Sequence, residues 1–90
     1  MPEREVTIVN RRGLHARAAA KFVKLAQSFE TATVHVEKTG TSVSGLSIMG
    51  LMMLAATPGT KLRLRAEGPA AEAALSALNR LVASGFDETD

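Results

Sequence analysis

The order in which hydrophobic periodicity changes along the chain constrains its fold more than any other feature. Apolar residues alternate with polar ones, as in half-buried strands, in four short segments, and they recur at helical spacing in three longer ones. The chain has 90 residues, which is enough material for one core. The order βαββαβα therefore predicts a single α+β domain over residues 1–90. We expect an open-faced sandwich in which three helices cover one face of a four-stranded antiparallel sheet.

The four expected strands are short and are separated by turn residues. In the first strand, over residues 5–9, Val6 and Ile8 alternate with polar neighbours. The segment Lys38-Thr39-Gly40 is typical of a turn and predicts a hairpin between the second and third strands. The alternating apolar residues of the other strands are Val34, Val36, Val43, Leu62, Leu64 and Ala66.

The three expected helices begin and end at recognisable residues. The first helix includes the Ala-rich run from Ala18 to Phe29, and the second extends from Ser47 to Ala56. The third starts at Gly68 and Pro69, which suit an N-cap and a first turn, and stops at Gly85. The apolar stripes of the first and third helices consist of Ala19, Phe22, Val23, Ala26 and Phe29, and of Ala71, Leu75, Leu78 and Val82.

The second helix carries more apolar surface than a small core needs. One stripe contains Leu51, Leu54 and Ala55. A second stripe, which points elsewhere, consists of Ile48, Met49 and Met52. Because both stripes cannot face the same sheet, the second one is expected to be exposed, and exposed Met-rich surfaces usually mark contacts with partners. A fully buried helix is the alternative interpretation.

The segment Gly13-Leu14-His15-Ala16-Arg17 places a histidine where the first helix begins. Unpaired backbone N–H groups, here those of Ala16 and Arg17, and the positive end of the helix dipole favour an anion at such a place. The planar guanidinium of Arg17 matches phosphate oxygens, and an imidazole with a free lone pair is a nucleophile. The motif favours phosphate chemistry at His15, against the simpler interpretation of a capping or surface histidine.

Ser47 directly precedes an apolar helical run and is therefore a good N-cap, which stabilises a helix by about 1 kcal/mol relative to alanine.

Several other classes of protein are not expected from this sequence. Cysteine is absent, and the two histidines, His15 and His35, come from different elements, so no metal site is predicted. Gly45 to Gly50 lacks the spacing of a hydrolase nucleophile elbow, and no Gly-x-x-x-x-Gly-Lys loop is present to bind ATP. A net charge of +2 without Trp or Tyr does not indicate nucleic-acid binding. No segment resembles a signal peptide or a membrane span, so we expect a cytoplasmic location without membrane contact.

Taken together, the motifs resemble those of HPr, the histidine-phosphorylated carrier of the bacterial phosphoenolpyruvate-dependent phosphotransferase system. The resemblance extends over nearly the whole chain and rests on the opening strand and on two motifs, Gly13–Arg17 and Ser47–Met53. It implies that His15 carries a phosphoryl group on a ring nitrogen, that Arg17 contacts this group, and that Ser47 is a site for a regulatory kinase. A phosphate on Ser47 is compatible with its capping role, because a helix N-terminus favours negative charge. Such a phosphate adds roughly −1.5 to −2 charge at the edge of the expected docking surface.

The resemblance also implies a set of partners. A carrier of this kind receives the phosphoryl group from enzyme I and passes it to enzyme IIA, and an HPr serine kinase/phosphorylase would act on Ser47. It is a monomeric carrier without a cofactor, and it is not an enzyme in the sense of turnover. Two positions depart from the usual HPr pattern: Ala18 stands where a proline is common, and Arg12 where a small polar residue is frequent. The missing proline predicts a less rigid helix start.

Two alternative functions remain open at this point. The tail Ser84-Gly85-Phe86-Asp87 resembles carriers of the nitrogen-related regulatory branch, whereas the Ser47 motif resembles carriers controlled by a serine kinase. A protein-interaction module that uses the Met-rich helix without phosphorylation belongs to a different class. It would be favoured if His15 proved inert.

Overall fold

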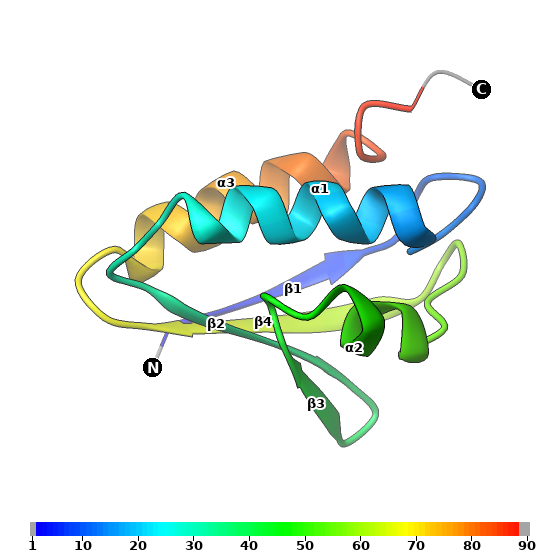
Figure 1. Cartoon of the computed structure of the whole chain (residues 1–90). Helices are drawn as coiled ribbons and strands as arrows, with labels where there is room; N and C mark the ends of the chain where they lie inside the picture. Colours follow the sequence, from blue (N-terminus) through cyan, green and yellow to red (C-terminus); the bar gives the residue numbers. More distant parts are fainter. Residues whose placement is uncertain (1, 89–90) are drawn as a thin grey trace.

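The computed structural model describes residues 2–88. Its elements follow the predicted βαββαβα order (Figure 1). The strands are β1 (Glu3–Thr7), β2 (Thr33–Lys38), β3 (Thr41–Ser44) and β4 (Lys61–Glu67), and the helices are α1 (Ala16–Gln27), α2 (Ile48–Met53) and α3 (Ala71–Ala83). The predicted α+β class and order of elements are confirmed.

The four strands form an antiparallel sheet in the order β1-β4-β2-β3. The register places apolar residues opposite one another, for example Val6 opposite Leu62, and Val36 between Leu64 and Val43. All of these side chains therefore lie on one face, because successive side chains in a strand alternate between the two faces. Helices α1 and α3 cover that face, and α2 packs against α1 and β3 (Figure 1).

The opposite face of the sheet is polar. Arg65 of the central strand β4 forms ion pairs with Glu3 of β1 (3.2 Å) and Glu37 of β2 (3.6 Å). These partly exposed pairs add little stability individually, but they agree with the register that turns the apolar residues toward the helices. His35 is half-buried on this polar face.

One core of apolar side chains fills the space between the sheet and the helices. The predicted stripe residues of α1 and α3 are buried, apart from Phe29, which follows the end of α1 and is partly buried. Phe22 and Phe86 are the bulkiest of the fully buried side chains. Burial of each large apolar side chain contributes about 1.5–3 kcal/mol, so this core accounts for most of the stabilisation of the fold.

The first and last elements of the chain, β1 and α3, begin or end at residues that differ from the predicted ones. Strand β1 begins at Glu3 and ends at Thr7. Ile8 lies beyond its end, because the Ile8 N–H donates to Thr60 O (2.9 Å) in the loop before β4. Helix α3 begins at Ala71 rather than at Gly68 and Pro69. Gly68 has a φ of +107°, which is outside the helical region, and its backbone lies against Thr31 O.

Helix α2 is shorter than the predicted segment from Ser47 to Ala56 and ends at Met53. Leu54 is its C-cap, and Ala55 has a φ of +52°, which stops helical propagation. The Nζ of Lys38 donates to Leu54 O (2.8 Å) and satisfies a carbonyl at this end. As a result Ala55 is exposed and does not join Leu51 and Leu54 on the buried stripe.

Candidate functional site

The loop between β1 and α1 is held against the chain that follows α2. Gly13 has a φ of +68°, and a Cβ atom at this position would lie 2.3 Å from Ala56 O. The next N–H, that of Leu14, donates to the same carbonyl oxygen (2.9 Å), and the Leu14 side chain is buried. Glycine is required here because only a residue without Cβ can approach the carbonyl so closely. These contacts fix the point at which α1 begins.

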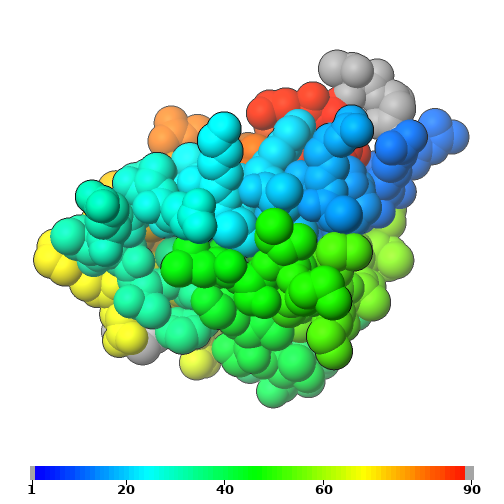
Figure 2. Space-filling model, in the orientation of Figure 1, coloured from blue at the N-terminus to red at the C-terminus, as the bar shows by residue number. Residues whose placement is uncertain are grey.

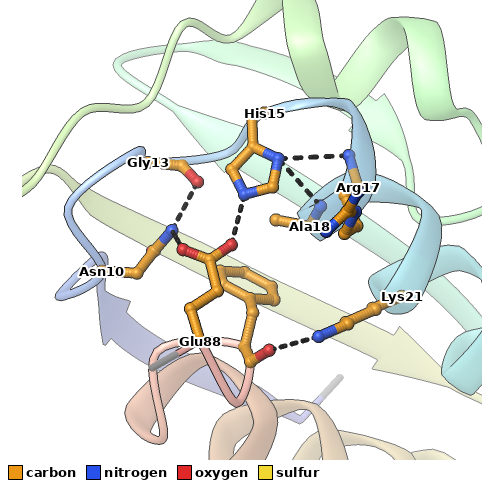
Figure 3. Close-up of polar contacts among 8 residues, drawn as sticks. Asn10, Gly13, His15, Arg17, Ala18, Lys21 and Glu88 are labelled. Carbon is orange, nitrogen blue, oxygen red and sulfur yellow. Dashed lines mark hydrogen bonds and ion pairs between the residues drawn. The ribbon is translucent and has the colours of Figure 1, made fainter. Parts of the chain in front are cut away.

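His15 is the N-cap of α1, as the sequence predicted for a histidine at the helix start. Its Nδ1 accepts hydrogen bonds from the backbone N–H groups of Arg17 (3.2 Å) and Ala18 (3.4 Å), as shown in Figure 3. A proline at position 18 would have no N–H to donate, so the second bond requires a residue other than proline here, and Ala18 meets that requirement. The donors to Nδ1 in the described residues are Arg17 and Ala18 and not Ala16, so the phosphate-binding role expected for the N–H of Ala16 stays a prediction.

The other ring nitrogen of His15 contacts a carboxylate from the far end of the chain. Nε2 is hydrogen-bonded to Oε2 of Glu88, and Oε1 of Glu88 accepts from Nδ2 of Asn10 (3.1 Å; Figure 3). The same Asn10 nitrogen donates to Gly13 O (2.7 Å). Asn10 and Glu88 therefore connect the loop before α1 to the tail after α3.

The pKa of Glu88 lies below its ordinary value of 4.5, chiefly because of the hydrogen bond to His15, with further contributions from Asn10 and from the positive charge of Arg12. Glu88 is thus ionised at neutral pH and can only accept hydrogen bonds. It follows that Nε2 of His15 carries the ring proton. Nδ1 accepts two backbone N–H bonds, which requires a lone pair on that atom. Both sides of the ring indicate the same Nε2–H tautomer.

Arg17 lies two positions after His15, in the first turn of α1, and is exposed. Its side chain forms no hydrogen bond or ion pair within residues 2–88, whereas its backbone N–H donates to Nδ1 of His15. The guanidinium is accordingly accessible to a ligand held at Nδ1. Its predicted contact with a phosphoryl group stays a prediction.

Ser47 is the N-cap of α2, and its Oγ accepts from the N–H of Gly50 (2.9 Å). The capping role predicted for this serine is confirmed. It stands at the edge of an exposed apolar surface, which we call the α2 patch. The patch contains the three predicted residues Ile48, Met49 and Met52, together with Leu46 and Met53.

The most exposed members of the α2 patch are Met49 (69%) and Met53 (79%). Figure 2 shows the surface of α2 directly beside that of α1. The α2 patch therefore lies on the helix that packs beside α1, the helix that His15 caps.

A family model described as "PTS HPr component phosphorylation site" matches residues 2–84. The chain belongs to the PTS HPr family. It is 48% identical over 88 residues to the phosphocarrier protein HPr of Pseudomonas aeruginosa, and the match covers 98% of each chain. Its function is accordingly that of a phosphocarrier in the phosphotransferase system.

Solved structures agree with this assignment. The crystal structure of HPr-C-His from Thermoanaerobacter tengcongensis matches with a TM-score of 0.93 at 42% sequence identity and covers 100% of both chains. A crystal structure of an HPr dimer from the same organism matches with a TM-score of 0.77 at 43% identity and covers 98% of this chain and 100% of that one.

The HPr resemblance leads to His15, Arg17 and Ser47, but it does not lead to Glu88, Asn10 or Lys21. The Nζ of Lys21 in α1 donates to Phe86 O (2.7 Å) and thereby holds the tail. The family model ends before Glu88, and 73 positions separate that residue from His15. The signal present in the sequence was Gly85, which predicts that the third helix stops there but not where the following residues go.

His35 does not join His15 in one site. His35 belongs to the polar face of the sheet, whereas His15 lies at the start of α1. Within residues 2–88 no group of three or more His, Asp or Glu side chains is arranged to hold a metal ion. In the same part of the chain, every helix is too short or too polar to cross a bilayer.

Proposed function

We propose that Nδ1 of His15 accepts a phosphoryl group from a donor resembling enzyme I and passes it to a histidine of an acceptor resembling enzyme IIA. The observation that carries this proposal is the orientation of the ring. Nδ1 has the lone pair and faces two N–H groups of the α1 N-terminus, whereas Nε2 is engaged by Glu88. Backbone N–H groups at a helix start and the helix dipole stabilise a phosphoryl group.

The transfer needs no bound cofactor and no proton donor on this chain. The lone pair of Nδ1 attacks phosphorus, the bond between phosphorus and the donor breaks, and its electron pair returns to the donor. In the second transfer the N–P bond of His15 breaks and its pair returns to Nδ1. The protein itself turns over no substrate: it holds the phosphoryl group on His15 between the two transfers, which is the behaviour of a carrier.

The α2 patch supports docking as part of the same function. It supplies an apolar surface next to the helix that carries His15, and Met side chains adapt to more than one partner. We assign Ile48, Met49 and Met52 to the docking of donor and acceptor, with Leu46 and Met53 at the edge. The carrier acts in the cytoplasm as a monomer, with the patch free for these partners, and binds neither nucleic acid nor membrane.

The test is incubation with phosphoenolpyruvate and enzyme I, followed by detection of acid-labile phosphate and by ¹⁵N NMR of the imidazole. The expected result is one phosphoryl group on Nδ1 of His15. Absence of labelling with an enzyme I that labels another HPr would contradict the proposal and favour an interaction module. Labelling on Nε2 would contradict the assignment of the nitrogen.

Arg17→Ala is expected to slow both phosphorylation and transfer to the acceptor by roughly tenfold to a hundredfold, while labelling persists. The exposed guanidinium supplies a charge-assisted hydrogen bond to the phosphoryl group, worth about 1.5–3 kcal/mol, but the backbone N–H groups remain. Rates are measured by quenched-flow labelling. Arg11→Ala, an exposed arginine in the preceding loop, is the control, and equal rates for both variants would show that Arg17 is a solvated side chain.

Ser47→Asp is expected to keep the fold and to weaken binding to enzyme I. Asp is an acceptable N-cap, but its charge stands beside the α2 patch, and the docking surface of the donor is expected to be acidic. The affinity is measured by calorimetry at low and high salt. A loss that shrinks at high salt supports a regulatory role for phosphorylation of Ser47 by an HPr serine kinase/phosphorylase.

Ser42→Asp is the matched control, because it adds the same charge to β3 on the polar face of the sheet. If both variants bind enzyme I as the parent does at low salt, Ser47 is a helix cap alone. If both bind equally weakly, the effect reflects net charge and not position.

A further inference from the structure

The tail that carries Glu88 is held in an unfavourable backbone conformation. Gly85, Phe86 and Asp87 all have positive φ, of 69°, 58° and 60°. For residues other than glycine this conformation is sterically unfavourable, so it persists only where surrounding contacts impose it.

Contacts on both sides impose this turn. The Phe86 side chain is fully buried, its N–H donates to Leu81 O (2.9 Å), and its carbonyl accepts from the ammonium group of Lys21. Glu88 N–H donates to Gly85 O (3.1 Å) and closes the turn. Chain ends are poorly ordered unless they are tied down, and here the anchoring delivers one carboxylate to one imidazole nitrogen.

The carboxylate of Glu88 is largely shielded from solvent, with 14% of the side chain exposed, and the His15 side chain is 23% exposed. Asn10 holds its second oxygen, so the carboxylate cannot rotate away without losing a hydrogen bond. A carboxylate fixed on one nitrogen of a histidine sets both the tautomer and the orientation of the ring. The opposite nitrogen then directs its lone pair to a defined position.

We propose that Glu88 is a positioning residue for phosphoryl transfer: it holds the Nε2 proton of His15 and balances the positive charge that the ring acquires when Nδ1 bonds to phosphorus. This inference rests on the proposed function of His15. Formation of the N–P bond uses the Nδ1 lone pair while Nε2 keeps its proton, so the ring becomes cationic. When the phosphoryl group leaves, the pair returns to Nδ1 and the ring is neutral again.

The negative charge of Glu88 could also repel the incoming phosphoryl group, which would slow the transfer. The geometry favours stabilisation, because Glu88 is bonded to Nε2, whereas the phosphoryl group attaches at Nδ1 on the other side of the ring, where Arg17 and the helix N-terminus lie. A hydrogen bond between a cation and an anion in a shielded place is stronger than a neutral one. Glu88 therefore acts on the phosphorylated state more than on the free one.

The experiment compares Glu88→Gln and Glu88→Ala with the parent in the full chain. At saturating enzyme I, the rate of acid-labile labelling is expected to fall about tenfold in Glu88→Ala and less in Glu88→Gln, which keeps an acceptor. The affinity for enzyme I is expected to be unchanged. In ¹H and ¹⁵N NMR of the unphosphorylated carrier, a low-field Nε2–H resonance in the parent is expected to weaken in Glu88→Gln and to vanish in Glu88→Ala.

Asp87→Asn is the matched control. It removes the neighbouring carboxylate, which is exposed, and asparagine tolerates the positive φ at this position. It should match the parent in rate and in the NMR spectrum.

The outcomes separate the two proposals. If the parent is labelled on His15 and Glu88→Ala is labelled at the same rate, the role of Glu88 is refuted and the carrier function stands. If Glu88→Ala is labelled faster than the parent, Glu88 repels the incoming phosphoryl group, and its proposed positioning role is refuted as well. If the parent is not labelled, both proposals are wrong.

Discussion

His15→Ala is expected to abolish phosphoryl acceptance while the protein remains folded. Alanine offers no nucleophile, and the backbone N–H groups of Arg17 and Ala18 hold a phosphoryl group only when an atom is present to bond it. The stability cost is modest but not zero. The imidazole caps α1 and contacts Glu88, and loss of a cap costs about 1 kcal/mol.

The measurement is acid-labile phosphate after incubation with phosphoenolpyruvate and enzyme I, with circular dichroism to show that the variant is folded. His35→Ala is the control, since His35 lies on the polar face of the sheet, away from α1. Labelling that survives in His15→Ala and disappears in His35→Ala would move the site to the other histidine. Labelling that survives in both variants would place the phosphoryl group on another residue type.

The sequence predicted those features that depend on neighbouring residues. The alternation around Val6 and Val34 predicted strands whose apolar residues share one face. Both His15 and Ser47 were expected at helix starts, and both cap a helix in the structure. Caps are readable because the donor and the acceptor lie within three residues of each other, so the local sequence contains the whole interaction.

Features that depend on distant contacts could not be predicted in the same way. The end of α2 is set by the positive φ of Ala55 and by Lys38, which comes from another element. The late start of α3 reflects the approach of Gly68 to Thr31 O. Glu88 reaches His15 only because a buried phenylalanine reverses the tail. None of these contacts leaves a periodic pattern in the sequence.

The α2 patch was predicted only in part from the sequence. Helical spacing separated the exposed residues Ile48, Met49 and Met52 from the buried Leu51. It did not add Leu46 or Met53 to the exposed set, because their exposure follows from where α2 begins and ends rather than from its periodicity. The surface available to a partner is therefore larger than the three predicted residues.

Apart from substitution of His15, Gly13→Ala is expected to cause the largest losses in stability and in the rate of phosphoryl transfer. The new Cβ would lie 2.3 Å from Ala56 O, which is a backbone atom that also accepts from Leu14 N–H and so cannot move without losing that bond. Positive φ adds strain for alanine. Together we expect a loss of about 3 kcal/mol in the free energy of unfolding, measured by urea denaturation.

Gly59→Ala separates backbone strain from the collision. Gly59 also has positive φ, +91°, but no atom lies within 4 Å of a Cβ built there, so this variant should lose only about 1–2 kcal/mol and keep the parent's transfer rate. In Gly13→Ala the loop must shift away from Ala56, and the N-cap His15 shifts with it. A displacement of about 1 Å at a reacting group can reduce a rate up to a hundredfold, so labelling at saturating enzyme I should slow by tenfold or more. Equal stability losses in the two variants, with unchanged labelling in both, would show that the contact between Gly13 and Ala56 does not hold His15 in place.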